Sequence, residues 1–174
     1  SDIVFAAQAV VPRERVERAR VAGILRRLAL VDPERRVVVK LRAAAGEHQT
    51  HFEHDSYPEL LHALGRMPEN LVLSTEPMQS ALDRAAGLVT ISSTAAIEAI
   101  ARGIPVLALD TFGVSPALIN VVFEGSGVIG GEDDLLAGRF RLPHESWWRE
   151  NYLHDPEEDD WTAAVERSMG LRRR

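Results

Sequence analysis

The sequence predicts an α/β protein built on a doubly wound parallel sheet flanked by helices. Short apolar runs rich in β-branched residues alternate along the chain with longer segments of helical period. Runs of this composition are typical of parallel strands that are buried on both faces. Alternation at this spacing implies strands joined by right-handed helical crossovers.

Five segments are expected to form the strands of this sheet. The clearest is Arg36 to Leu41, where Val37, Val38 and Val39 follow one another. Consecutive β-branched side chains favour a strand that is buried on both faces. The five expected strands are residues 3–7, 36–41, 71–73, 88–91 and 106–109.

Helices are expected between these strands. In the first, from Pro12 to Leu30, Val21, Ile24, Leu25 and Leu28 recur with the period of an amphipathic helix. The helix expected over 94–102 is closed by Gly103, and Pro105 follows two residues later, which is a common end of a helix. The expected helices are residues 12–30, 58–64, 77–85, 94–102, 116–122 and 160–169.

Length and composition indicate one ordinary globular domain. The chain has 174 residues, which we interpret as a single domain, 1–174, with residues 140–174 as a helical extension. It has no cysteine, which excludes disulfides, thiolate metal sites and cysteine nucleophiles. No apolar run reaches the roughly 20 residues of a membrane span, so no transmembrane segment is expected. The formal net charge of -6 argues against general nucleic-acid binding, so no nucleic-acid partner is expected.

The start of the chain suggests a piece of a longer polypeptide. Ser1 and Asp2 lead directly into a strand, without an initiator methionine. We therefore expect a fragment that begins at a domain boundary.

Function is expected at one edge of the sheet. In doubly wound sheets, ligands bind outside the carboxyl ends of the strands. The polar residues that follow the expected strands are Gln8, Lys40, Arg42, Ser74, Thr75, Ser92, Ser93, Thr94 and Asp110. Lys40 stands out because every other basic residue of the chain besides histidine is an arginine.

The most informative stretch is residues 87–110, GLVTISSTAAIEAIARGIPVLALD. Ser92, Ser93 and Thr94 lie where a strand leads directly into a helix, so hydroxyls, backbone N–H groups and the positive end of the helix dipole converge. Such a point suits a phosphate. The alternative is that these residues only cap the helix, since serine and threonine are favoured caps.

Glu98 is the one acid in this otherwise apolar helix. It lies four residues after Thr94, on the same face, where the ribose next to a bound diphosphate would lie. The alternative is an ion pair with Arg102 one turn further on, and both can hold together.

The polar run from Glu47 to Asp55 contains three histidines at intervals of three residues. Glu47 and His51 are the candidates for acid–base catalysis or for contact with a donor, because the run follows the second strand. A metal site is less favoured, since nothing places these side chains on a rigid element. Otherwise the run is a polar loop.

The pattern SSTAAIEAIARGIPVLALD resembles the serine- and threonine-rich, glutamate-containing helix of GT-B glycosyltransferases, particularly bacterial capsule-polysaccharide and teichoic-acid polymerase relatives. The resemblance covers residues 3–130 in element order, and residues 92–110 carry the motif. It implies a Rossmann-like lobe, the C-terminal one of two, that binds a nucleotide-sugar. It further implies phosphate contacts by Ser92, Ser93 and Thr94, and a ribose contact by Glu98.

The chain departs from these relatives after the second strand. They often have a His-Pro pair there, whereas this strand ends in Lys40, Leu41 and Arg42. The two cations occupy alternate positions and so point the same way from a strand. Together they could neutralise a diphosphate leaving group without a metal. For Arg42, surface solubility is the alternative.

The sequence therefore predicts the donor-binding domain of a glycosyltransferase of cell-surface polysaccharide or glycoconjugate synthesis. The expected partners are a nucleotide-sugar and the N-terminal lobe of the same polypeptide, without which the chain is expected to be inactive. No cofactor or metal is expected, and the expected location is the cytoplasm or, through the full-length protein, the periphery of the inner membrane. The alternatives are a sugar-nucleotide 2-epimerase or glycerophosphotransferase on the same scaffold, and a non-catalytic nucleotide-binding module.

Overall fold

The computed structural model describes residues 1–9, 11–42, 55–112 and 123–151. It divides into two compact units, residues 1–142 and 143–174. The first unit has six strands in its described part: β1 (Asp2–Ala6), β2 (Val37–Lys40), β3 (Leu71–Ser74), β4 (Ala85–Thr90), β5 (Val106–Leu109) and β6 (Ile129–Gly130). Its described helices are α1 (Arg15–Val31), α2 (Tyr57–Ala63), α3 (Met78–Leu82), α4 (Ala95–Ala101) and α5 (Glu132–Leu136).

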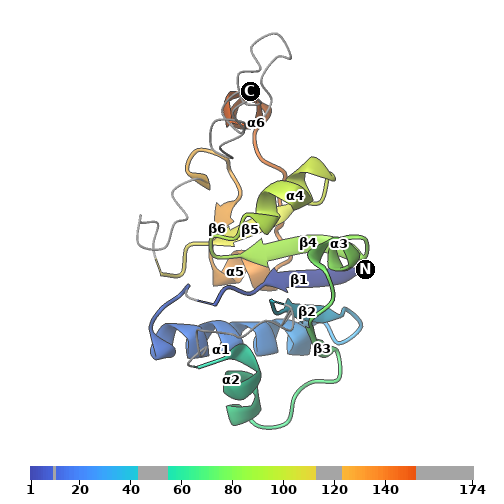
Figure 1. Cartoon of the computed structure of the whole chain (residues 1–174), viewed down its shortest axis with the longest axis vertical. Helices are drawn as coiled ribbons and strands as arrows, with labels where there is room; N and C mark the ends of the chain where they lie inside the picture. The colour runs from blue at the N-terminus through green and yellow to red at the C-terminus, as the bar shows by residue number, and fades with distance from the viewer. Residues whose placement is uncertain (10, 43–54, 113–122, 152–174) are drawn as a thin grey trace, which may run out of the picture. The chain divides into compact units, whose positions relative to one another are not determined.

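The strands form one parallel sheet in the order β3-β2-β1-β4-β5-β6 (Figure 1). This is the order of a Rossmann-like doubly wound sheet, and it confirms the predicted fold class. The chain winds outward from β1 to β3 and then returns to the other side of β1 to form β4. The direction of winding therefore reverses between β1 and β4, the position at which such sheets bind their ligands. The carboxyl ends of β1 and β4 point to the left in Figure 1.

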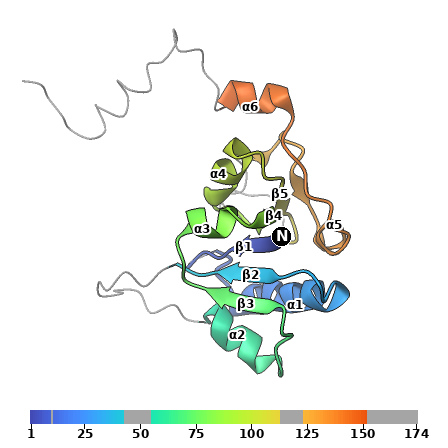
Figure 2. The ribbon, with the colours of Figure 1, turned by 90° about the vertical axis from the view of Figure 1, so that its right-hand side faces the viewer.

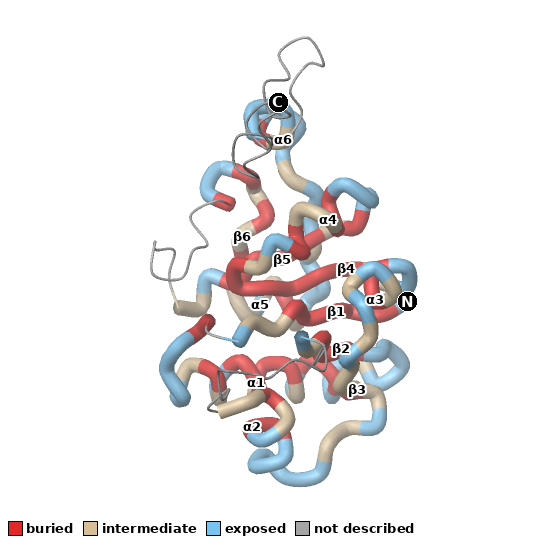
Figure 3. Tube along the Cα trace, viewed as in Figure 1, coloured by how far each residue is buried: buried red, intermediate tan, exposed pale blue. Residues whose placement is uncertain are grey.

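Helices cover both faces of the sheet. Figure 2 shows α3 and α4 on one side of the strands and α5 on the other. One continuous core joins α1, α2 and α5 to alternate strand residues, such as Ile3 and Phe5 in β1 and Val37 and Val39 in β2. The central strands are buried along almost their whole length (Figure 3). A sheet buried on both faces explains why its strands read as uninterrupted apolar runs in the sequence.

The five predicted strands and the four predicted helices that fall in the described residues are all present, with shifted ends. The first helix begins at Arg15 rather than Pro12, because Glu14, the residue before it, has an extended backbone (φ -77°, ψ 137°). The helix predicted over 77–85 ends at Leu82, because Ala85 already pairs with Asp2 in the sheet.

The sequence analysis did not predict β6 or α5, and it gave no bounds for the helix α6 (Glu145–Asn151), which lies within the helical extension expected over 140–174. A strand of two residues and a helix of five are too short to show a period. The helices predicted over 116–122 and 160–169 lie outside the described residues. In α6, Trp147 is buried, and its ring lies 6.5 Å from that of Trp148.

Candidate functional site

A cleft of about 630 Å³ opens at the carboxyl edge of the sheet. It lies where the winding reverses, since its walls come from the segments that follow β1, β2, β3 and β4. The lining residues are Ala7, Gln8, Ala9, Val11, Lys40, Leu41, Arg42, Glu76, Pro77, Met78, Ser93 and Thr94. Four of the predicted phosphate ligands, namely Lys40, Arg42, Ser93 and Thr94, therefore share one cleft.

Lys40 is the last residue of β2 and is only 5% exposed. Its Nζ donates a hydrogen bond to the carbonyl of Leu41. Burial lowers the pKa of the Lys40 ammonium, and the neighbouring Glu76 carboxylate partly offsets this effect. A buried ammonium beside a polar cleft is suited to an anionic ligand, because the ligand's charge replaces the lost hydration.

The start of α4 forms the opposite wall. The Ser93 N–H donates to Thr90 Oγ1 at 3.0 Å, and the Ala95 N–H donates to Ser93 Oγ at 3.2 Å. Some of the backbone donors expected to be free for phosphate are thus satisfied by neighbouring hydroxyls. The Ser93 and Thr94 side chains still line the cleft, and Thr94 is exposed.

Gln8 joins the two strands on either side of the reversal. Its Nε2 donates to Ser92 Oγ at 3.1 Å, and its Oε1 accepts from the Ser92 N–H at 3.2 Å. Ser92 is buried and does not line the cleft. In this structure Ser92 therefore anchors the segment before α4 to the segment after β1.

Arg18, a residue that the sequence analysis did not identify, holds the segment that contains Gln8. Its side chain is buried in α1, and its guanidinium donates to the carbonyls of Gln8 at 3.0 Å and Asp55 at 2.9 Å. The guanidinium also lies 4.5 Å from the centre of the Tyr57 ring. The sequence could have indicated that Arg18 is buried, because Arg18 falls on the same helix face as Val21 and Leu25.

Glu98 forms the ion pair that the sequence offered as the alternative to a ribose contact. Its side chain is 40% exposed, and it pairs with Arg102 at 3.1 Å. Arg102 also pairs with Asp83 at 2.9 Å, which joins α4 to the end of α3. Glu98 does not line the cleft, and its ribose role stays a prediction.

Asp110 is exposed after β5, and it too does not line the cleft. Its N–H donates to the carbonyl of Gly130 at 2.9 Å. Its predicted contact with a nucleotide-sugar stays a prediction.

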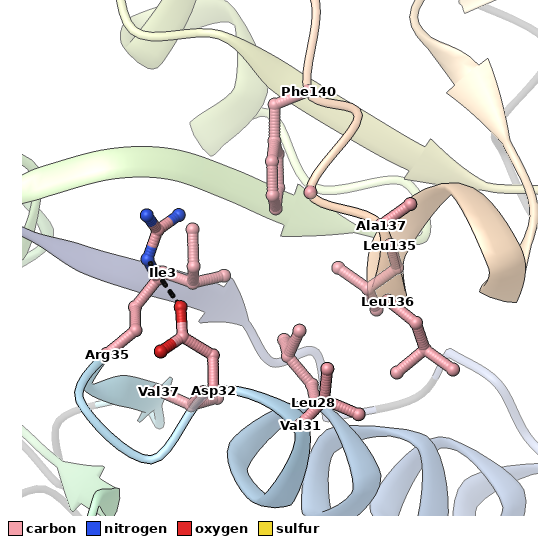
Figure 4. A pocket seen from close by; sticks show the side chains of 11 residues that line it. Ile3, Leu28, Val31, Asp32, Arg35, Val37, Leu135, Leu136, Ala137 and Phe140 are labelled. Atoms are coloured by element: carbon pink, nitrogen blue, oxygen red, sulfur yellow. Dashed lines mark ion pairs between the residues drawn. The ribbon is translucent and has the colours of Figure 1, made fainter.

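A second cavity, of about 470 Å³, lies between the end of α1 and α5 (Figure 4). Ile3 and Val37, which pair near the amino ends of their strands, form its floor, so it opens at the opposite edge of the sheet. Asp32 and Arg35, its charged residues, pair with each other at 3.4 Å. None of the predicted site residues lines it, and we place the candidate site in the cleft at the carboxyl edge.

Residues 1–168 match the protein family described as "Putative glycosyltransferase (DUF6716)". This match spans nearly the whole chain. The chain belongs to this family. No curated protein matches it.

Two solved structures with low sequence identity are similar to this family member. One is the glycotransferase of kitacinnamycin, with 15% identity, a TM-score of 0.46, and coverage of 98% of this chain and 39% of that one. The other is apo UGT2 of Phytolacca americana, with 12% identity, a TM-score of 0.44, and coverage of 98% of this chain and 44% of that one. The chain spans less than half the length of either structure.

The remaining predicted residues of this family member cannot be placed in the site. Glu47 and His51 lie outside the described residues.

Across residues 1–9, 11–42, 55–112 and 123–151, no group of three or more histidine, aspartate or glutamate side chains could hold a metal ion. In the same ranges, no helix combines the length and the apolar character needed to cross a bilayer.

Proposed function

We propose that this chain is the donor-binding part of a glycosyltransferase and that the cleft holds the diphosphate of a nucleotide-sugar. The observation that supports this most directly is the cleft itself. It brings Lys40, Arg42, Ser93 and Thr94 from two separate parts of the sequence to the point where the winding of the sheet reverses.

In the proposed reaction, the bond between the sugar's anomeric carbon and a phosphate oxygen breaks, and the diphosphate leaves with its bonding electrons. The sugar forms a bond with the oxygen of an acceptor hydroxyl group, and the proton of that group passes to a base or to water. Lys40 and Arg42 stabilise the negative charge that develops on the leaving diphosphate. The two cations take this role without a metal.

In this proposal, a preceding lobe of the same polypeptide binds the acceptor and supplies the second wall of the active site. The proposed process is cell-surface polysaccharide or glycoconjugate synthesis at the cytoplasmic side of the membrane. We expect no sugar transfer from this chain by itself, because water would reach the donor freely.

The test is isothermal titration calorimetry with inorganic pyrophosphate, with uridine, cytidine and guanosine, and with their diphosphates. Lys40→Ala should weaken binding of pyrophosphate and of the best diphosphate about 10-fold to 150-fold, the effect of losing a charge-assisted hydrogen bond of about 1.5 to 3 kcal/mol. Binding of the nucleoside should change little, since it lacks the charge that Lys40 meets.

Arg66→Ala is the matched control, because Arg66 is a cation with a 91% exposed side chain that does not line the cleft. It should leave all affinities within about twofold of wild type. Equal binding of pyrophosphate by the wild type and Lys40→Ala would refute the phosphate site.

A further inference from the structure

Glu76 is a carboxylate inside the cleft that the proposed function does not use. It lies in the segment between β3 and α3, and it lines the cleft together with Lys40 and Arg42. Its side chain is 29% exposed, so it is partly enclosed and still open to a ligand. A carboxylate repels a phosphate, and its presence in the same cleft as Lys40 and Arg42 needs a reason.

Neighbouring side chains hold the Glu76 carboxylate in place. The Arg84 guanidinium donates to Oε1, and the Glu76 N–H donates to Ser74 Oγ at 3.2 Å. Arg84 also lies 3.8 Å from Asp2, which pairs with Arg36 at 2.7 Å. Glu76 is therefore the end, at the cleft, of a chain of ion pairs beside the sheet.

The same contacts keep Glu76 ionised. The hydrogen bond from Arg84 lowers the pKa of the Glu76 carboxyl. An ionised carboxylate is an acceptor only, with about four acceptor positions on its two oxygens. Arg84 and the Ser74 hydroxyl leave part of this capacity for a ligand.

A fixed acceptor in the same cleft as two cations suits a ligand that combines phosphate with hydroxyl donors. The cations favour any diphosphate, whereas the carboxylate favours only one that presents hydroxyl groups beside it. We propose that Glu76 accepts hydrogen bonds from a vicinal diol adjacent to the diphosphate, and so selects nucleotide-sugars over simpler phosphates. A nucleotide-sugar has such a diol in its ribose and in its transferred sugar. This inference rests on the proposed function.

The role assigned to Glu76 differs from the one that the sequence pattern assigned to Glu98. Glu98 pairs with Arg102 and does not line the cleft, whereas Glu76 does. The two carboxylates therefore give different expectations for the same measurement.

The experiment compares diol-containing and deoxy ligands by calorimetry. For the ribose, the probes are the best-bound nucleoside diphosphate and its 2′-deoxy form; for the sugar, they are glucose 1-phosphate and 2-deoxyglucose 1-phosphate. We expect the wild type to prefer the diol about 10-fold in one of these pairs. Glu76→Gln should remove most of that preference and, by removing a negative charge, should bind pyrophosphate as well as wild type or more tightly.

Three further variants make the test decisive. Glu132→Gln is the matched control, since Glu132 also pairs with an arginine and is 19% exposed, but does not line the cleft. It should keep the diol preference. Glu76→Asp keeps the charge but shortens the side chain, and it should lose the diol preference. This variant keeps the test available if Glu76→Gln does not fold. Loss of the preference in Glu98→Gln, with Glu76→Gln unchanged, overturns the proposal.

The two proposals fail in different ways. A wild type that binds pyrophosphate through Lys40 but shows no diol preference overturns the role of Glu76 alone. If Glu76→Gln weakens the binding of pyrophosphate and of both members of each ligand pair equally, the role of Glu76 is overturned as well. Such equal losses of affinity indicate a structural role. A wild type that binds neither pyrophosphate nor any nucleotide overturns both proposals.

Discussion

Replacing Arg18 by methionine tests how the cleft wall is built. Methionine has a similar length and no charge, so Arg18→Met keeps most of the packing and removes the donors. The guanidinium donates to Asp55 at 2.9 Å and to Gln8 at 3.0 Å, with longer contacts of 3.4 Å to Ala9 and Pro12. Because Arg18 is only 2% exposed, water cannot easily replace these hydrogen bonds.

The expected cost follows from the two short hydrogen bonds. Each bond from a charged donor contributes about 1.5 to 3 kcal/mol, and the lost contact with the Tyr57 ring adds to this. Arg18→Met also removes the free-energy cost of burying the Arg18 charge, and this gain offsets part of the loss. We therefore expect Arg18→Met to lower the free energy of unfolding by about 3 kcal/mol. For a protein of this size, that corresponds to a fall of about 6 to 12 °C in the melting temperature.

Urea denaturation and calorimetry measure this loss directly. Arg18→Lys keeps the charge but not the fork of donors, so its loss should be about half as large. At temperatures where both variants are folded, pyrophosphate binding should also weaken in Arg18→Met, since Gln8 and Ala9 line the cleft. A loss of stability below about 0.5 kcal/mol would refute the reasoning.

Three other measurements test separate parts of the molecule. Gly87→Ala should destabilise the protein by about 1 to 3 kcal/mol in urea denaturation, because its Cβ would lie 2.9 Å from the ring of Phe140. Asn70→Ala should cost about 2 kcal/mol by the same assay, since the Asn70 amide donates at 2.8, 3.1 and 2.8 Å to three carbonyls at the end of α1 and in the turn after it. Binding of a nucleoside diphosphate should weaken as the pH rises through the lowered pKa of Lys40, before the ordinary lysine value of 10.5, and calorimetry should show no such fall in Lys40→Met.

The sequence was sufficient to predict the class of the fold because the sheet is buried on both faces. Parallel strands in that environment are uninterrupted apolar runs, such as Val37 to Val39, and helices between them fix the parallel direction. The order of the strands did not follow from the runs themselves. It depends on crossovers whose placement is decided by packing across the whole sheet.

The grouping of residues in the candidate site was predicted in part, because the position of a residue at a strand end does not show which side chains it contacts. The rule about strand ends correctly brought Lys40 and Arg42 into one cleft with Ser93 and Thr94. The sequence also offered the pair of Glu98 with Arg102, which is present, but not the pairing of Arg102 with Asp83, because that pair joins two helices that meet only in the folded protein.

The same rule could have identified Glu76, which follows the end of β3 by two residues. Nothing in the sequence indicates, however, that Arg84 holds its carboxylate, since the two are brought together by α3. The ion pair of Glu98 with Arg102 lies within one turn of a helix and could be predicted from the sequence, whereas the pair of Glu76 with Arg84 forms only when α3 brings the two together.

Among the residues that the structure describes, Arg18 and Lys40 are the buried cations, and they differ in what compensates their burial. The Arg18 guanidinium is surrounded by backbone carbonyls and an aromatic ring, so its burial is compensated within the fold. Lys40 has three donors on one nitrogen, and its hydrogen bond within the described residues goes to the Leu41 carbonyl. Burial lowers the pKa of Lys40, which means that its charge costs stability in the folded chain. In the proposed function, the diphosphate bound in the cleft compensates this charge, and for this reason Lys40 is the residue on which the proposed phosphate site depends.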